Sequence, residues 1–245
     1  MALADTAAWT AFDAAASDDA GIRIADQFIA DHDRLGRMTV EAAGLYLDLS
    51  KQSWSRTAFE ACLDLARATG VEAARARLFG GEAINATEGR AVLHPALRAR
   101  TGADFHALGE PVSAEVDAVR ADMAAYATAV RAGSETGTTG KAFTAIVHIG
   151  IGGSDLGPRV VWDALRPLDP AIDLRFVANI DPRDMAEALT GLAPETTLVI
   201  VVSKTFTTQE TLANAEAAKA WLAAGLPEAG RDKHFIGVTA APRKA

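Results

Sequence analysis

The stretch AIVHIGIGGSDLGP, residues 145–158, decides the fold class of this 245-residue chain. It begins as a short apolar run typical of a buried strand, passes through glycines and reaches Pro158, near which we expect a helix to start. Further helix starts are expected near Pro182 and Thr208, between the apolar runs TAIVHIG, DLRFVAN, TLVIVVS and FIGVTA. Strands that are apolar on both faces and separated by helices indicate parallel βαβ crossovers. The sequence therefore predicts an α/β domain whose parallel sheet is flanked by helices.

The N-terminal half of the chain has a different pattern, in which one helical segment follows another. In TVEAAGLYLDLSKQ, the residues Val40, Ala43 and Leu47 recur at the spacing of one apolar helix face. The segment TAFEACLDLARATG is predicted to be a helix that ends at a C′ glycine, Gly70. A longer amphipathic helix is predicted over SAEVDAVRADMAAYATAVRAG, which stops at Gly133.

Between the halves lies GSETGTTGK, residues 133–141, whose glycines and hydroxyl side chains are typical of a linker or an exposed turn. We therefore expect a helical N-terminal region over residues 1–132 and an α/β domain over residues 133–245. A chain of this length is able to bury a substantial core.

Composition excludes several classes of function. The net charge is -8 with no basic block, which argues against a nucleic-acid partner but leaves a small anionic ligand open. The single cysteine, Cys62, shares a helical face with Phe59, Leu63 and Ala66, so we expect a buried structural thiol and no disulfide framework. The N-terminus lacks a basic segment and no apolar run is long enough to span a membrane. These features predict a cytoplasmic protein without a membrane partner.

The glycine-rich loop resembles a dinucleotide-binding motif only in part. From Gly150 the first two glycines of G-x-G-x-x-G are present, but the third position is Asp155, whose carboxylate would face the pyrophosphate. Asp181, after the second predicted strand, imitates the acid that binds a ribose and keeps this interpretation open. A dinucleotide is nevertheless disfavoured.

A triphosphate-binding loop is also incomplete. Gly152 and Gly157 have the required spacing, but Pro158 and Arg159 stand where a lysine and a Ser or Thr are needed. A tight turn alone would not need so many glycines. Bare amides near a helix N-terminus, with the hydroxyl of Ser154, instead indicate a smaller phosphate group.

A second loop, VVSKTFTTQET, residues 201–211, follows the third predicted strand and is expected at the same edge of the sheet. Its hydroxyls and its lysine suit a phosphate monoester at a helix N-terminus. A capping box of Thr207 and Glu210 would account for part of this pattern without any ligand. The capping box does not explain the presence of Ser203, Lys204, Thr205 and Thr208.

These two loops together resemble the glucose-6-phosphate isomerase family, which has the sugar isomerase (SIS) fold. The segments that carry the resemblance are HIGIGGSDLGP, VVSKTFTTQET, MTVEAAGLYLDLSKQ and GEAINATEGRAVLHPALRAR. The resemblance implies reversible isomerisation of glucose 6-phosphate and fructose 6-phosphate, in glycolysis and gluconeogenesis. It implies no cofactor, because the hydrogen moves as a proton, and a homodimer for the full-length protein.

The resemblance also implies roles for individual residues. The sugar phosphate would be held by Gly153, Ser154, Ser203, Lys204, Thr205 and Thr208. Glu210 would orient the histidine that opens the sugar ring, in competition with its capping role.

Family members are about twice as long, and their proton-transferring glutamate lies in a second SIS domain. We therefore expect this chain to be an N-terminal part that carries the phosphate half-site, truncated before that domain and inactive alone. A non-catalytic sugar-phosphate-binding SIS module is the alternative. No histidine has the spacing of a metal site, so no metal is expected, and His148 is expected to be a packed core residue.

Overall fold

The computed structural model describes residues 2–167 and 170–244, which form two compact units that divide between Asp117 and Ala118. The division falls inside helix α7 (Ser113–Arg131), earlier than the boundary expected after residue 132. The reason is that the second half of α7 packs on the sheet, where Tyr126 and Val130 contact Phe143 and Leu198. In the described part of the chain, no helix has both the length and the apolar character of a membrane span.

The first unit combines short helices with two small hairpins. Its elements are η1 (Leu3–Asp5), α1 (Ala7–Asp18), α2 (Ile24–Ala30), α3 (Arg34–Arg37), β1 (Thr39–Ala42), β2 (Leu45–Asp48), α4 (Arg56–Ala68), α5 (Val71–Phe79), α6 (His94–Arg98), β3 (His106–Ala107) and β4 (Glu110–Pro111). The fully buried Arg34 guanidinium holds the loop after β2 by donating to three backbone carbonyls, at 2.5–2.7 Å, from Ser50, Gln52 and Trp54.

The prediction of a helix around Val40 is wrong, because the segment forms the antiparallel hairpin β1–β2. Ala43 and Gly44 lie in the turn with φ of 54° and 75°, and two consecutive positive φ values are the signature of a tight hairpin turn. Val40 and Leu47, expected on one helix face, are instead cross-strand partners.

Two predictions about α4 have different outcomes. Its end is confirmed, because α4 stops at Ala68 and Gly70 has the left-handed φ of 74°. The expected core face is only partly present: Cys62 is half-buried, and Leu63 is exposed.

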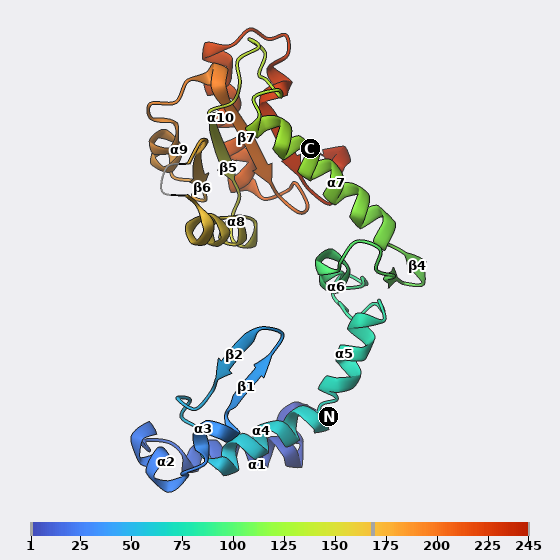
Figure 1. Ribbon diagram of the computed structural model, residues 1–245, viewed down its shortest axis with the longest axis vertical. Coiled ribbons are helices and arrows are strands. Elements are labelled where there is room, and N and C mark those ends of the chain that lie inside the picture. Colours follow the sequence, from blue (N-terminus) through green and yellow to red (C-terminus); the bar gives the residue numbers. More distant parts are fainter. Residues whose placement is uncertain (1, 168–169, 245) are drawn as a thin grey trace. The chain divides into compact units, whose positions relative to one another are not determined.

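The second unit contains the predicted parallel sheet, which is confirmed. Its elements after α7 are β5 (Ala145–Ile149), α8 (Gly153–Leu165), β6 (Asp173–Val177), α9 (Pro182–Leu189), η2 (Pro194–Thr196), β7 (Thr197–Val202), α10 (Gln209–Gly225), η3 (Arg231–His234), β8 (Phe235–Val238) and η4 (Pro242–Lys244). The strand order is β6-β5-β7-β8 (Figure 1). The chain passes from β5 to its neighbour β6, and then returns past β5 to form β7 on the other side of β5.

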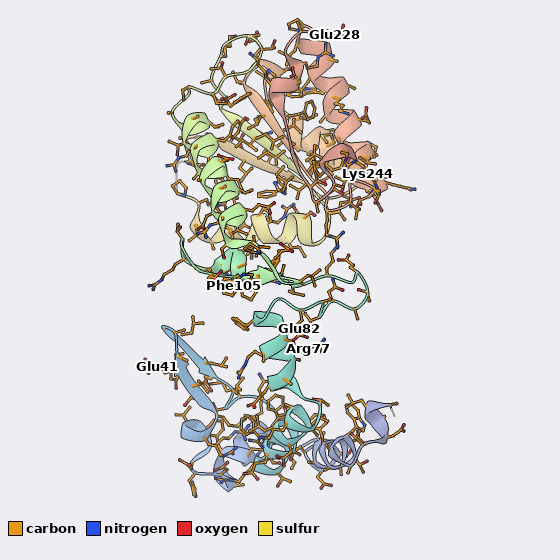
Figure 2. All side chains as sticks on the ribbon, turned by 90° about the vertical axis from the view of Figure 1, so that its right-hand side faces the viewer. Glu41, Arg77, Glu82, Phe105, Glu228 and Lys244 are labelled. Atoms are coloured by element: carbon orange, nitrogen blue, oxygen red, sulfur yellow. The ribbon has the colours of Figure 1, made fainter. Side chains whose placement is uncertain are left out.

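The two faces of the sheet carry different helices. One face forms the main core with α9 and α10, from residues that include Val147, Ile149, Val177, Val199, Val201, Met185, Ala215, Ala218 and Leu222. The other face carries Ile146, His148, Phe176 and Leu198; α7 packs there, and Arg159 of α8 lies over the Phe176 ring. Figure 2 shows α7 and α10 on opposite sides of the sheet.

The helix starts expected at Pro182 and Thr208 are confirmed, whereas α8 starts at Gly153 and contains Pro158. Proline has no N–H for the carbonyl four residues earlier, which is that of Ser154. The ring nitrogen Nε2 of His148 lies 2.9 Å from this carbonyl oxygen and takes the place of the missing donor. A buried side chain of β5 therefore allows the helix to begin before its proline.

The segment over residues 133–141 is a turn as predicted, but its middle is tied to the sheet. The Thr138 amide donates to Nε2 of His234 at 3.0 Å, and Nδ1 of His234 lies 2.8 Å from the Thr197 carbonyl oxygen. Because His234 is fully buried, it connects this turn with the start of β7.

Candidate functional site

The loop between β5 and α8 is tightly folded. A side chain at Gly150 would place its Cβ 2.7 Å from the Ser154 carbonyl oxygen, so this close approach requires glycine. Gly152 precedes α8 with φ of 59° and ψ of −122°. The exposed Gly153 opens the helix, and its amide has no acceptor among the described residues. The N-terminus of α8 therefore presents a free donor beside Ser154, whose side chain is half-buried.

The loop between β7 and α10 begins at Ser203, which is 3% exposed. Its amide donates to the Val238 carbonyl at 3.0 Å, but its buried hydroxyl has no hydrogen-bond partner in the described part of the chain. Lys204 is exposed, and its carbonyl accepts from the Ala240 amide at 3.0 Å, which ties the loop to the end of β8. Buried polar groups almost always have a partner, and the Ser203 hydroxyl at the carboxyl end of β7 has none among the described residues.

The rest of this loop carries three threonines. The hydroxyls of Thr205 and Thr207 lie 2.6 Å apart and bond to each other. Between them, Phe206 adopts a left-handed φ of 52° and packs against the main core. Thr208 is the N-cap residue of α10.

The predicted capping box is wrong. The N-cap is Thr208 rather than Thr207, and no side chain caps this end of α10. The exposed Glu210 side chain forms no hydrogen bond or ion pair with any residue that the structure describes. The first turn of α10 therefore keeps amides that are available to an anion.

The two loops leave neighbouring strands at the same edge of the sheet. Ile149 of β5 is in register with Val201 of β7, and the strands are parallel. After them the chain turns to opposite faces, to α8 in one case and to α10 in the other. Such a point, where the strand order reverses, is where ligands bind in open α/β sheets. Gly153 and Ser154 thus follow β5 at the same edge of the sheet at which the residues from Ser203 to Thr208 follow β7.

The third loop at this edge, between β6 and α9, satisfies its own polar groups. The amides of Ala178 and Asn179 both donate to Oδ2 of Asp184 at 2.9 Å. Asp181, which imitated a ribose-binding acid in the sequence, caps α9 by accepting from the Arg183 amide at 2.9 Å. This loop is closed by its own side chains, which further disfavours a dinucleotide.

Two features of the site were not anticipated. Asp155 is not a bare carboxylate, because it is buried and forms a two-pronged ion pair with Arg159. His148 is a buried residue as predicted, and it also supports the start of α8. The four-residue spacing of Asp155 and Arg159 on one helix face was the available sequence signal. In residues 2–167 and 170–244, no cluster of His, Cys, Asp and Glu is able to hold a metal ion.

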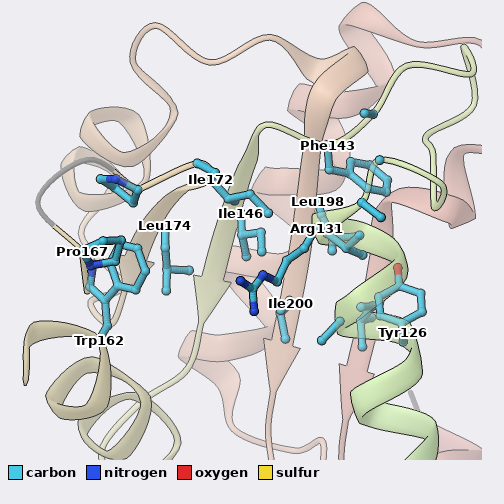
Figure 3. Close-up of a pocket in the computed structure, with 18 residues that line it drawn as sticks. Tyr126, Arg131, Phe143, Ile146, Trp162, Pro167, Ile172, Leu174, Leu198 and Ile200 are labelled. Carbon is cyan, nitrogen blue, oxygen red and sulfur yellow. The ribbon is translucent and has the colours of Figure 1, made fainter. Parts of the chain in front are cut away.

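The second unit also has an apolar cavity of about 870 Å³ away from these loops. It lies on the face between α7 and α8, where Ile146, Leu174 and Ile200 form its floor and Trp162 and Tyr126 its walls (Figure 3). Burial raises the pKa of the Tyr126 phenol, and the carboxylate of Glu135 adds to this shift. Its lining is mostly apolar, with Arg131 as the charged residue among those that line it, so it suits a sugar phosphate poorly.

Comparison with known proteins connects the loops to a family. The family model for phosphoglucose isomerase matches residues 48–245. A glucose-6-phosphate isomerase of Caulobacter vibrioides is 60% identical over 235 residues, and the match covers 96% of this chain and 44% of the relative. One from Deinococcus deserti is 48% identical over 240 residues, covering 97% and 44% respectively.

A solved structure agrees with these relatives. The crystal structure of a glucose-6-phosphate isomerase from Chlamydia trachomatis matches with a TM-score of 0.78 at 27% identity. That match covers 98% of this chain and 45% of the other. The chain thus spans less than half the length of the relatives it matches.

Proposed function

The chain belongs to the phosphoglucose isomerase family, and we propose that the whole protein interconverts glucose 6-phosphate and fructose 6-phosphate. In this proposal the described part holds the phosphate of the sugar, between the N-termini of α8 and α10. The residues that hold it are Gly153, Ser154, Ser203, Lys204, Thr205 and Thr208.

One observation carries the proposal, which is the buried Ser203 hydroxyl that lacks a partner. It lies at the carboxyl end of β7, next to the strand that leads into α8. A phosphate oxygen would supply the missing partner and would also accept from the Gly153 amide and from the first-turn amides of α10. The Lys204 ammonium would add a positive charge close to the phosphate.

The chemistry assigned to this part is binding rather than proton transfer. Isomerisation moves a proton between C2 and C1 and needs a base, and the family resemblance assigns that base to a second SIS domain. Glu210 is exposed at the first turn of α10 and is available to orient a ring-opening histidine supplied from elsewhere. The reaction needs no redox cofactor, because the hydrogen is transferred as a proton.

The family resemblance also supports two expectations about the whole protein. We expect a homodimer and a cytoplasmic location, since both belong to the family that the loops resemble. Sedimentation of the whole protein tests the first, and fractionation of its host cells tests the second.

The phosphate site can be tested by following backbone amides of the 245-residue chain in an NMR titration. Glucose 6-phosphate and inorganic phosphate should both shift the amides of residues 150–156 and 203–211, whereas glucose should not. A coupled assay of the same sample should show no isomerisation above background. If glucose 6-phosphate leaves both loops unchanged, or if the chain turns over substrate, the proposed division of labour is wrong.

A further inference from the structure

The buried carboxylate of Asp155 presents an electrostatic problem for the proposed anion site. Asp155 is in the first turn of α8, and its residue is 4% exposed. The positive end of a helix attracts any anion, so this carboxylate and a phosphate compete for the same pole. A phosphate bound at the Gly153 amide would be a like charge within one turn of helix from this buried carboxylate.

Arg159 forms an ion pair with this carboxylate in a fixed geometry. Its Nε and Nη2 atoms donate to the two Asp155 oxygens, each at 3.0 Å. The guanidinium carbon lies 4.7 Å from the centre of the Phe176 ring, which holds the planar group in place. Phe176 in turn packs against His148, with ring centres 5.3 Å apart, and His148 contacts the Ser154 carbonyl.

These contacts form a closed brace around the start of α8. Two strands and one helical turn meet in it, since His148 and Phe176 are paired residues of β5 and β6. The brace fixes Ser154 through its carbonyl and Asp155 through its carboxylate.

We propose that Arg159 is a positioning residue of the anion site, which neutralises Asp155 and turns its carboxylate away from the phosphate. The inference rests on the proposed function, because it concerns the same phosphate site. Arg159 acts through Asp155 and does not itself contact the ligand. Without Arg159, the carboxylate would be unpaired and would repel the phosphate or occupy its amides.

A purely structural ion pair makes a different prediction. If Arg159 and Asp155 only stabilise α8, removing either side chain should weaken the helix, and removing both should not help ligand binding. If Arg159 neutralises Asp155, only the loss of the arginine harms binding, and removing the carboxylate as well repairs it. The signs of the two single effects therefore separate the two explanations.

The test measures glucose 6-phosphate affinity of the 245-residue chain by calorimetry, with circular dichroism to verify folding. Arg159→Gln should weaken binding about tenfold or more by charge repulsion. Asp155→Asn should bind as well as the unmodified chain or better, and the double variant should match Asp155→Asn. Lys219→Gln is the matched control, because it removes one cation from an exposed pair with Glu216 farther along α10 and should change nothing.

Each outcome bears on the inference. A folded Arg159→Gln chain that binds within about twofold of the unmodified chain overturns it, as does a double variant no better than Arg159→Gln. If Arg159→Gln does not fold, the double variant is compared with Asp155→Asn instead. A double variant that binds glucose 6-phosphate more weakly than Asp155→Asn then overturns the inference. An unmodified chain that binds no sugar phosphate removes the proposed function and this inference together, whereas the other contrary results leave the proposed function standing.

Discussion

Replacing Ser203 by alanine is expected to change stability and ligand affinity in opposite directions. The Ser203 hydroxyl is buried without a partner, while the amide of the same residue is bonded to Val238. Burying an unpaired hydroxyl costs on the order of 1–3 kcal/mol, and the substitution removes that cost without touching the backbone bond. The free energy of unfolding of the ligand-free chain should therefore rise, by about 1 kcal/mol once the small void is included.

Binding of a sugar phosphate should respond the other way. In the ligand-bound chain the hydroxyl would donate to a charged oxygen, and such a hydrogen bond contributes about 1.5–3 kcal/mol. Its loss corresponds to a decrease in affinity of about 10-fold to 150-fold. A single oxygen atom thus stabilises the complex and destabilises the free chain.

The assay pairs urea unfolding of the ligand-free chain with calorimetric titration of glucose 6-phosphate. Thr197→Val serves as the control, because Thr197 lies at the opposite end of β7 with its fully buried hydroxyl donating to the Ala193 carbonyl at 2.8 Å. That variant should lose about 1 kcal/mol of stability and keep the affinity unchanged.

Two results would refute the reasoning about Ser203. If Ser203→Ala lowers the free energy of unfolding by about as much as Thr197→Val does, the Ser203 hydroxyl has a partner such as a buried water. If the variant binds glucose 6-phosphate as tightly as the unmodified chain, the hydroxyl is not part of the site.

Three further predictions concern the frame around the site. His234→Ala should lower the free energy of unfolding by on the order of 3 kcal/mol, because it leaves a void and two unpaired backbone groups, and thermal unfolding measures this. Phe206→Ala removes the apolar side chain that packs the β7–α10 loop against the core, so amides in that loop should lose protection from hydrogen exchange. Sugar-phosphate binding, measured by calorimetry, should weaken several-fold. Lys51 and Ser50 lower the pKa of Asp48 to about 2, so its contribution to stability is present above the unfolded value of about 3.9 and is lost as pH falls through about 2. An NMR titration of the Asp48 carboxyl should show this midpoint, and Lys51→Ala should raise it.

Local pattern was sufficient for much of the second unit. The apolar runs around Val147, Phe176, Val199 and Ile236 predicted all four strands, since a strand covered on both faces needs a continuous apolar segment. The glycine and hydroxyl residues of the two loops also led to the prediction of an anion site, because such loops expose amides at helix N-termini, and this site stays a prediction. Both interpretations depend only on residues that are near one another in the chain.

Where the sequence misled, the local pattern allowed two structures, and a contact or a turn of the folded chain decided between them. Pro158 suggested a helix start, but His148 from β5 supplies the donor that the proline lacks, so α8 begins earlier. Val40 and Leu47 fitted a helix by spacing, yet a turn with two positive φ values makes them cross-strand partners. A helical period and a hairpin can share an apolar pattern over so short a segment, and only the turn distinguishes them.

The sequence by itself determined which chemical groups stand in the two loops where we propose an anion site: bare amides, hydroxyls and one lysine, at strand ends. Only the tertiary structure decided that β5 and β7 are neighbouring strands, followed by helices on opposite faces of the sheet. The same packing left the Ser203 hydroxyl without a partner and placed the Arg159 guanidinium over the Phe176 ring. Burial and pairing are properties of the folded chain, since they depend on side chains that meet only when distant segments pack together.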